Sequence, residues 1–569
     1  MLSFLGVAVL GLVGGAKGPM GRGDAAPVDL VIDHAQIYDG SGDPPFAGAL
    51  AIQGDRIVAV LKEGEARPAA TATLDAKGLA VAPGFVNMLS WATDTLLEDG
   101  RSQGDLRQGV TLEVMGEGES MGPLNAAMKQ FMVEQQADLK FPIEWTTLGE
   151  YLDHLVKRGI ACNVASFVGA TTVRIHEVGY ADRAPNAEEL ARMRALVKQA
   201  MEEGALGVGS SLIYAPAFYA KTDELVALCE AAAPYGGRYI SHLRSEGNRW
   251  LEGIDELIDI ARRAKVGGEI YHFKAAGAQN WNKVDTTLAK IEAARQSRLD
   301  VTADMYLYTA GATGFDASMP PWVQEGGYPA WAARLRDPAI RARLVHEMTT
   351  PTDQWESLYL DAGGPEHVIC TGFKSAALKP LTGKTLAQIA KLRGKSAEET
   401  IMDLVVEDGT RVEVIYFLMS EENVRRELAL PWMAFGSDAG SMAPEGNFLK
   451  SSCHPRAYGN VARLLGRYVR DEKLAPLAEV VRRLTSFPCE NLKIKQRGRL
   501  AAGYFADVVV FDPATVADHA TYEKPHQFST GVRAVFVNGV AVIEAGESTG
   551  AKPGQVVRGP GWKSGTPGR

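Results

Sequence analysis

The centre of the chain alternates amphipathic helices with short apolar strands, and this alternation restricts the possible folds more than any other feature. Helical periodicity over 185–204 is followed by the strand ALGVGSSLI, and TDELVALCEAAAPYGG is followed by RYISHL. The same order then recurs, with GGEIYHFK after 248–266 and DVTADMYLY after 282–297. Strands that are separated by helices pair in parallel and are covered by those helices. Because the alternation runs through most of the centre, it predicts an α/β protein with a closed (β/α)8 TIM barrel.

Two β-rich blocks bracket this central region. Residues 28–82 contain VDLVIDHAQIYDG and GALAIQGDRIVAVL, in which Gly-Asp marks a hairpin turn. Residues 490–550 contain RGRLAAGYFADVVVFDP and GVRAVFVNGVAVIEAG, in which Asn538-Gly539 marks a second hairpin. The economical interpretation is one small β-sandwich made from both chain ends, beside a barrel over 83–489.

Three segments depart from the barrel pattern. Residues 320–426 combine Trp, Pro and charged helices, and we interpret them as an insertion before the last barrel strand, WMAFGSDAG. Residues 551–569 are rich in Pro and Gly and are expected to form a flexible tail. The apolar run within residues 1–27 is either a disordered leader or the core of an export signal, although no Lys or Arg precedes it. We therefore expect a periplasmic or secreted protein if this segment is a signal peptide, and a cytoplasmic one otherwise.

Composition and charge exclude several classes of function. The chain of 569 residues carries a net charge of -9, which argues against nucleic acid or an anionic membrane as a partner. Its five cysteines are scattered and show no CxxC pattern, so a disulfide framework is not expected. No G-x-G-x-x-G or Walker pattern opens a predicted helix, and no stretch is long and apolar enough to span a bilayer. We expect a small-molecule partner, and the sequence carries no signal for oligomeric state.

Polar side chains stand at the ends of four predicted barrel strands, where catalytic residues of such barrels lie. They are Glu117 and Glu119 in EVMGEGES, His242 in YISHLRSEG, His272 in EIYHFKAAG and Asp438 in MAFGSDAG. Each alone is more often a structural or turn residue. Two imidazoles and a carboxylate together suit a zinc-like ion that leaves a position for water. Asp438 would then move a proton from that water to the leaving nitrogen.

Several longer segments together carry a family resemblance. They are ALGVGSSLIYAPAFYAKTDEL, ISHLRSEG, HFKAAGAQNW, DVTADMYLYTAG, FGSDAG and RGRLAAGYFADVVVFDP. From about Val28 to Gly550 the chain resembles the N-acyl-D-amino-acid deacylases of the amidohydrolase superfamily. It implies a metal-dependent hydrolase that cleaves a linear amide bond of N-acyl-D-amino acids, with His242 and His272 as metal ligands and Asp438 as the base.

The resemblance also implies a set of substrate contacts. Lys274 and Arg456 would contact the substrate carboxylate, Tyr306 would be another contact, and Tyr214 would donate a hydrogen bond near the scissile carbonyl. An arginine offers a planar fork to a carboxylate and a lysine adds a point charge. Two cations that converge on a small pocket are costly unless an anion balances them. We therefore expect a substrate that bears a carboxylate.

The chain departs from the family pattern at two places. Leu89 and Trp91 stand where relatives have a His-x-His pair after Pro-Gly-Phe, and neither side chain can ligate a metal. Many relatives also place a cysteine ligand in the loop EVMGEGES, where Glu117 is our expected ligand and Glu119 its rival. We therefore expect one divalent ion per chain. Zinc suits these ligands, and cobalt, manganese or nickel would be tolerated.

These departures leave alternatives open. The chain could be an amidohydrolase that acts on another amide, a peptide or a cyclic amide, or it could be a non-catalytic ligand-binding relative. We favour the enzyme because Lys274, Tyr214 and Arg456 are all retained beside one plausible metal site.

Overall fold

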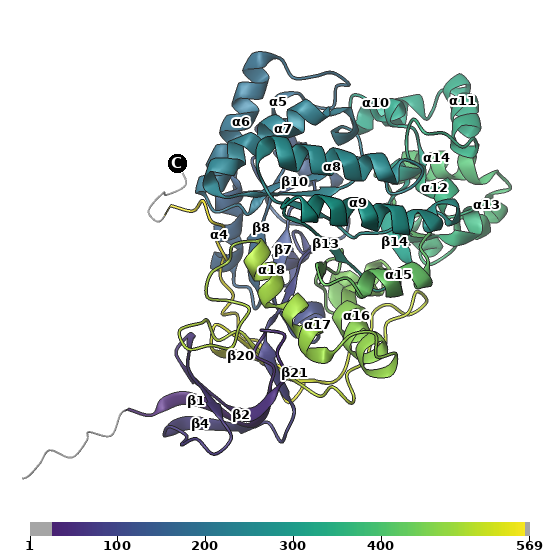
Figure 1. The fold of residues 1–569 in the computed structure, drawn as a ribbon. Helices are drawn as coiled ribbons and strands as arrows, with labels where there is room; N and C mark the ends of the chain where they lie inside the picture. The colour runs from purple at the N-terminus through teal and green to yellow at the C-terminus, as the bar shows by residue number, and fades with distance from the viewer. Residues whose placement is uncertain (1–25, 564–569) are drawn as a thin grey trace, which may run out of the picture.

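A ring of parallel strands forms the centre of the computed structural model, which describes residues 26–563 (Figure 1). Two runs of strands, in the orders β17-β13-β12-β11-β10-β9 and β6-β7-β8, pair in parallel. Phe167 alone separates β8 from β9, and the ring closes where the Met88 N–H donates to the Phe435 carbonyl. This is the hydrogen-bond pattern of the predicted (β/α)8 barrel. The strands are β6 (Phe85–Asn87), β7 (Val110–Met115), β8 (Asn163–Ser166), β9 (Val168–Gly169), β10 (Gly207–Ser211), β11 (Arg238–His242), β12 (Gly268–Ile270), β13 (Val301–Met305) and β17 (Met433–Phe435).

Amphipathic helices cover the outside of the barrel. α8 buries Ile254, Leu257, Ile258 and Ala261, whose spacing places them on one helix face. α6 begins at a capping box, in which the Asn186 side chain accepts from backbone N–H groups of the first turn. The covering helices are α4 (Leu148–Arg158), α5 (Ala170–Glu177), α6 (Ala187–Glu202), α7 (Thr222–Ala232), α8 (Trp250–Ala264), α9 (Val284–Gln296), α15 (Glu421–Leu428) and α17 (Leu477–Leu484). Shorter or peripheral helices are α1 (Thr95–Glu98), α2 (Gln103–Leu106), α3 (Ala126–Gln135), α16 (Arg456–Arg463) and α18 (Ser486–Asn491).

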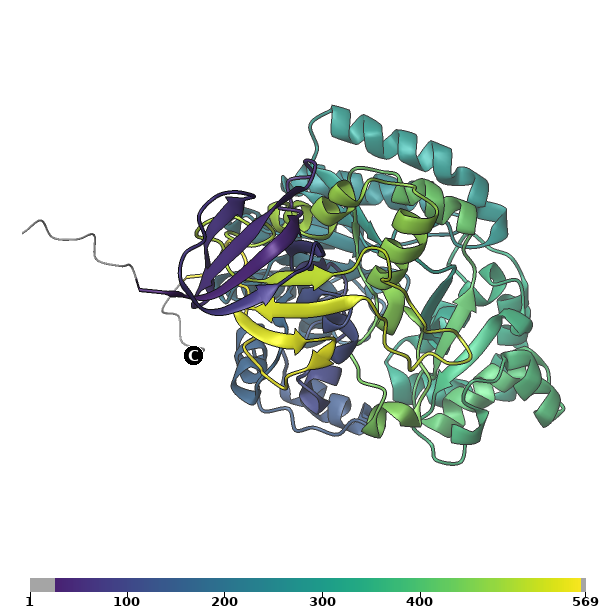
Figure 2. The same cartoon turned by 90° about the horizontal axis from the view of Figure 1, so that it is seen from below.

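The β-rich ends of the chain form one continuous nine-stranded sheet within the described residues. β5 pairs antiparallel with β18, so the purple and yellow strands lie side by side (Figure 2). The two ends of the chain therefore build one β-domain together. Asn538 and Gly539 form the predicted hairpin turn, both with positive φ. The strands are β1 (Val28–Ile37), β2 (Phe46–Gln53), β3 (Arg56–Lys62), β4 (Ala70–Asp75), β5 (Ala80–Pro83), β18 (Val508–Phe511), β19 (Val532–Val537), β20 (Val540–Glu544) and β21 (Glu547–Ser548).

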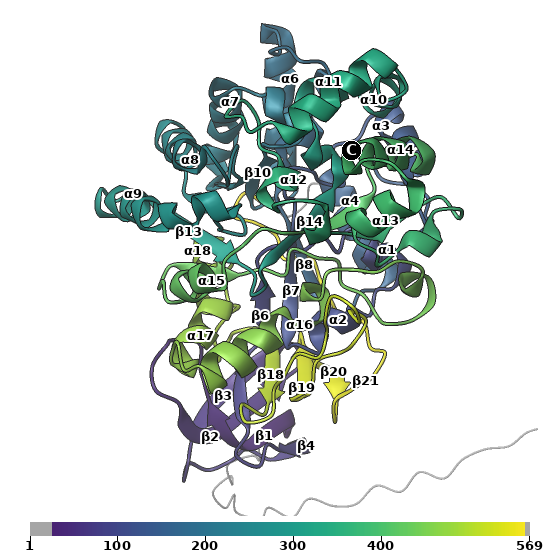
Figure 3. The same ribbon diagram turned by 90° about the vertical axis from the view of Figure 1, so that its right-hand side faces the viewer.

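An insertion lies between β13 and β17, which pair directly with each other. It starts at Ala310 rather than at the predicted Pro320, because β14 pairs with β16 across the insertion and so belongs to its three-stranded sheet. Figure 3 shows its helices gathered around β14. The elements are β14 (Ala310–Gly314), β15 (Val368–Gly372), β16 (Glu413–Phe417), α10 (Tyr328–Arg334), α11 (Pro338–Thr349), α12 (Leu358–Asp361), α13 (Leu386–Arg393) and α14 (Ala397–Asp408).

The predicted flexible tail is wrong for residues 551–563. The Val557 N–H donates to the Val164 carbonyl, and the Val164 N–H donates to the Gln555 carbonyl. The Gly559 N–H donates to the Gly204 carbonyl. The tail thus satisfies backbone groups at the amino end of β8. The remaining tail and the predicted leader up to residue 25 lie outside the described residues, and no helix within 26–563 is long and apolar enough to cross a bilayer.

Asp507 joins the β-domain to the barrel. Its side chain pairs with Arg497, and both side chains are 7% exposed. Its Oδ1 accepts from the Asn538 N–H at 2.9 Å and from Asn163 Nδ2, on β8, at 3.2 Å. This carboxylate therefore satisfies donors from three segments that are distant in sequence.

We predict that Asp507→Ala lowers the free energy of unfolding by about 3–5 kcal/mol, because it leaves the Arg497 cation buried without its partner. Urea denaturation followed by circular dichroism would measure the change. Glu490→Ala is the matched control, since the Glu490–Arg499 pair is exposed, and it should cost less than about 1 kcal/mol. Equal losses in the two variants would contradict the prediction.

Candidate metal centre and active site

Glu117, His242 and His272 converge at the carboxyl ends of three barrel strands. Their ligand atoms all lie within 4.8 Å of one another, and all three side chains are buried. Glu117 Oε1 lies 2.8 Å from His272 Nε2 and 3.2 Å from His242 Nδ1. The two ring nitrogens face each other at 2.9 Å. One carboxylate oxygen and two imidazole nitrogens aimed at one point are a donor set that fits a divalent ion.

The strands position these ligands through short, unusual backbone segments. His242 is the last residue of β11, and Glu117 follows the end of β7 by two residues. His272 follows β12 by two residues and has φ of 36°, in the left-handed region that a residue other than glycine rarely adopts. Its N–H donates to Asp304 Oδ1 at 3.0 Å, which holds this conformation. Such strain is typical of residues that are fixed for function.

Glu246 lies behind the two histidines, and the sequence analysis missed it. Its Oε1 lies 3.0 Å from His272 Nδ1, and its Oε2 lies 3.7 Å from His242 Nε2. A carboxylate behind a ligating histidine fixes the ring and leaves the other nitrogen for the metal. The signal was available in ISHLRSEG, where Glu246 stands four residues after His242.

A second buried carboxylate, Glu356 from the insertion, holds the loop that carries Glu246. It accepts from the backbone N–H groups of Glu246 and Gly247 at 2.6 and 2.8 Å, and from the Ser245 hydroxyl at 2.6 Å. The insertion therefore contributes to the position of the residue behind the histidines.

The charges of this pocket favour a cation. Burial raises the pKa of Glu117, but His272 and His242 outweigh burial and hold it well below its usual range. Burial likewise opposes ionisation of Glu246, but Lys274 and the histidines lower its pKa to about 2. Both carboxylates are therefore ionised at neutral pH. Lys274 pairs with Glu246, and Glu117 faces the two imidazoles, whose protons a bound ion would replace.

Asp438 lies beside this cluster, three residues after β17, and also has left-handed backbone, with φ of 50°. Its N–H donates to the Leu89 carbonyl at 2.8 Å. Its Oδ2 lies 2.9 Å from Arg456 Nη1, and its Oδ1 accepts from the Trp91 indole N–H at 3.1 Å. Burial raises the pKa of Asp438, with Arg456 opposing and Glu117 adding to the rise. A carboxylate of raised pKa is a better proton acceptor than an ordinary aspartate.

Three predicted substrate contacts surround the cluster. The Tyr214 ring packs edge-on against His242 at 5.4 Å between centroids, and burial raises the pKa of Tyr214 well above its usual value, so its hydroxyl stays a donor. The Arg456 guanidinium lies 4.4 Å from the centroid of the Tyr306 ring. The Tyr306 hydroxyl and Arg456 Nε are buried and have no hydrogen-bond partner among the described residues.

The expectation that two unbalanced cations converge on the pocket is wrong. Lys274 Nζ lies 2.6 Å from Glu246 Oε2, and Arg456 pairs with Asp438. Both cations are almost completely buried. The protein supplies these anions itself because a buried, unpaired charge is too costly. A substrate carboxylate would therefore join existing ion pairs instead of neutralising free charge.

The structure separates Glu117 from Glu119, the two candidates for the carboxylate ligand, and places Leu89 and Trp91. Glu119 is exposed and stands apart from the histidines, whereas Glu117 lies between them. Leu89 is fully buried in an apolar cluster with Val86 and Met88. Trp91 is 37% exposed and points its indole N–H into the site.

A family model of amidohydrolases matches residues 72–543. The chain belongs to this amidohydrolase family. The D-aminoacylase of Alcaligenes xylosoxydans xylosoxydans is 33% identical over 95% of this chain and 99% of that protein. The N-acyl-D-glutamate deacylase of Bordetella bronchiseptica, solved with zinc and a phosphonate inhibitor, superimposes with a TM-score of 0.76 at 29% identity over 94% of this chain and 100% of that one. A D-aminoacylase structure described as having a binuclear metal centre superimposes with a TM-score of 0.77 at 30% identity over the same shares.

These relatives show that the chain is a metal-dependent hydrolase. Zinc is bound in one of the superimposed structures, and the cluster of Glu117, His242 and His272 could hold such an ion here. When bound, the ion would polarise a carbonyl and activate water.

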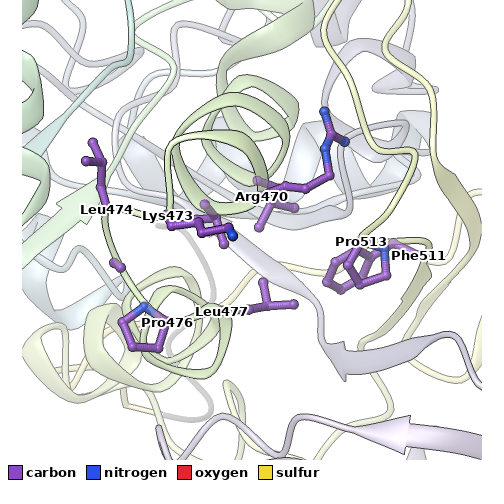
Figure 4. Close-up of a pocket in the computed structure, with 10 residues that line it drawn as sticks. Arg470, Lys473, Leu474, Pro476, Leu477, Phe511 and Pro513 are labelled. Atoms are coloured by element: carbon purple, nitrogen blue, oxygen red, sulfur yellow. The ribbon is translucent and has the colours of Figure 1, made fainter.

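A separate cavity of about 470 Å³ in this amidohydrolase lies away from the cluster (Figure 4). Apolar side chains such as Leu474, Leu477 and Phe511 line it, with Arg470 and Lys473 beside them. Phe511 contacts Phe85, the first residue of β6, with 5.9 Å between ring centroids. The cavity therefore lies toward the amino ends of the barrel strands, where residues of this fold serve stability rather than catalysis.

We predict that Glu117→Gln and His272→Ala lose the bound ion, because each removes a ligand atom. Glu246→Gln should keep the ion but bind it about 10–100-fold more weakly, as expected for a residue behind a ligand. Elemental analysis after dialysis would measure both effects. Glu119→Gln is the control and should retain the ion. If Glu119→Gln loses the metal while Glu117→Gln retains it, the ligand assignment is wrong.

A second prediction concerns proton transfer. Asp438→Asn should lower turnover by roughly 10²–10⁴-fold, because the amide cannot accept a proton. Its oxygen can still accept from Arg456, so the metal content should change little, whereas the melting temperature should fall because the buried Arg456 cation loses its anion. Steady-state kinetics and elemental analysis on the same preparation would separate the two effects. Near-normal turnover would remove Asp438 from the mechanism.

Proposed function

We propose that this amidohydrolase deacylates N-acyl-D-amino acids. Relatives of about 30% identity over nearly the whole chain are a D-aminoacylase and deacylases of N-acyl-D-aspartate and N-acyl-D-glutamate. The observation that carries the proposal lies beside the cluster of Glu117, His242 and His272, where the Tyr306 hydroxyl and Arg456 Nε are buried donors without a partner among residues 26–563. Buried polar groups are nearly always paired, so unpaired donors in a site indicate a ligand that supplies the acceptor.

The free carboxylate of an N-acyl amino acid supplies such an acceptor. Arg456 keeps one side of its guanidinium on Asp438 and can present its remaining N–H groups to the substrate. The Tyr306 ring packs against this guanidinium, and its hydroxyl is a further donor for the substrate. Lys274 lies 5.7 Å from the Tyr306 ring centroid and adds positive charge behind it.

The same placement orders the reacting groups. With the carboxylate held at Arg456, the amide lies toward the cluster of Glu117, His242 and His272. Tyr214, whose hydroxyl stays protonated, can donate to the acyl oxygen as negative charge develops there. Asp438 can accept a proton from the attacking water and deliver it to the leaving nitrogen. Glu246 and Asp304 hold His272 in place, the first through its ring and the second through its backbone N–H.

Capture of the carboxylate also provides a basis for stereochemical preference. Three points fix the substrate: the carboxylate at Arg456 and Tyr306, the acyl carbonyl at the cluster, and the leaving nitrogen near Asp438. The hydrogen and the side chain on Cα then occupy different surroundings for the two enantiomers. The D configuration itself is proposed from the named relatives.

We predict that N-acyl-D-amino acids are cleaved and that their carboxyl amides are cleaved at least about 10-fold less efficiently, because the amides lose a charge-assisted hydrogen bond. Comparison of kcat/KM for matched acid and amide substrates would test this. Tyr306→Phe should lower kcat/KM about 10–100-fold for the acid only. Tyr308→Phe is the matched control, since Tyr308 is a buried tyrosine two residues away that donates to Asp518.

The alternatives are distinguishable in the same assay. Equal rates on acids and neutral amides or cyclic amides would show that the enzyme acts on another amide class. Absence of turnover in a fully metal-loaded preparation, with retained binding of N-acyl amino acids, would favour a binding protein.

A further inference from the structure

The indole N–H of Trp91 is shared by two acidic side chains of the site. Trp91 Nε1 lies 3.0 Å from Glu117 Oε2 and 3.1 Å from Asp438 Oδ1. Glu117 uses its other oxygen toward the histidines, and Asp438 uses its other oxygen toward Arg456. The metal ligand and the proposed base are therefore linked through one neutral donor.

The backbone fixes the indole in this place. The Trp91 N–H donates to the Ala439 carbonyl at 3.0 Å, next to Asp438, and the Ser90 N–H donates to the Val114 carbonyl at 2.8 Å. The chain after β6 is thus held between the chain after β17 and strand β7, whose end carries Glu117. Trp91 is 37% exposed, so part of the ring faces solvent while its N–H edge meets the two carboxylates.

Two carboxylates close to one atom repel each other unless positive charge lies between them. A metal ion is one group that bridges two carboxylates, because it supplies positive charge to both. Here a polarised N–H occupies the bridging position, and the aromatic ring fills the space beside it.

We propose that Trp91 takes the place of a second cation between Glu117 and Asp438. It is a positioning residue, which orients the base by hydrogen bonding and excludes a further ion by occupying the bridging position. The exclusion concerns metal binding alone. The orientation of the base rests on the proposed function, in which Asp438 transfers the proton.

Metal stoichiometry tests the exclusion without any substrate. Wild type, Trp91→Phe and Trp91→Ala would be dialysed against increasing free zinc, and the bound zinc would be measured by elemental analysis. We expect one ion in wild type and in Trp91→Phe, whose ring still fills the space, and a second, weaker ion in Trp91→Ala. Two ions in wild type, or only one in Trp91→Ala at saturating zinc, would overturn the exclusion.

Separate measurement of kcat and KM tests whether Trp91 positions Asp438. Trp91→Phe removes only the N–H, so we expect kcat to fall by roughly 10-fold, with KM and the first zinc ion unchanged. Trp322→Phe is the matched control, since its indole donates to Glu347 in the insertion, at 2.8 Å, and it should retain full kcat. Unchanged kcat in Trp91→Phe would overturn the positioning role.

The proposed function and the inference about Trp91 can be contradicted independently of each other. If wild type cleaves no N-acyl-D-amino acid, the proposed function fails, while the zinc stoichiometry of the three proteins still decides the exclusion. If wild type cleaves these substrates and Trp91→Ala gains no second ion, the inference about Trp91 fails and the proposed function stands.

Discussion

The closure of the barrel between β6 and β17 is the contact on which the site depends. At this seam the Asp438 N–H donates to the Leu89 carbonyl and the Trp91 N–H donates to the Ala439 carbonyl. The two chain segments that leave the strands are thereby held against each other, beside the end of β7. One register brings Asp438, Glu117 and their shared indole donor together. A shift by one residue would turn alternate side chains away from the site.

Charge balance explains how so many ionised groups remain buried at this seam. Lys274 is paired with Glu246, and Arg456 is paired with Asp438, so these four charges cancel within the protein. Removing one partner of such a pair is strongly destabilising, which gives the pairs a structural role as well. Glu117 faces the two imidazoles of His242 and His272 instead of a lysine or an arginine. In the proposed function, the substrate carboxylate would therefore meet donors in fixed directions rather than a region of net positive charge.

The strand-end residues could be predicted because they follow from the alternation of helices and strands and from one rule about barrels. The network behind them could not, because Glu246 and Glu356 meet only through the folding of a loop against the insertion. The Pro/Gly-rich composition of the tail predicted flexibility and was misleading. Gln555 and Val557 bind Val164 through backbone hydrogen bonds, which leave no signal in the side-chain sequence. Trp91 was recognised only as a lost ligand, since a ligand pattern says nothing about hydrogen-bond donors.

The Trp91 indole also makes the orientation of Asp438 independent of a second metal ion. A bridging ion is held at equilibrium, so its occupancy varies with the free metal concentration. A tryptophan side chain is part of the chain, and its N–H is present at every metal concentration. The relative orientation of Glu117 and Asp438 is therefore set when the barrel closes, before any ion binds. In the proposed arrangement the metal supply controls only the cluster of Glu117, His242 and His272, while the fold controls the orientation of Asp438.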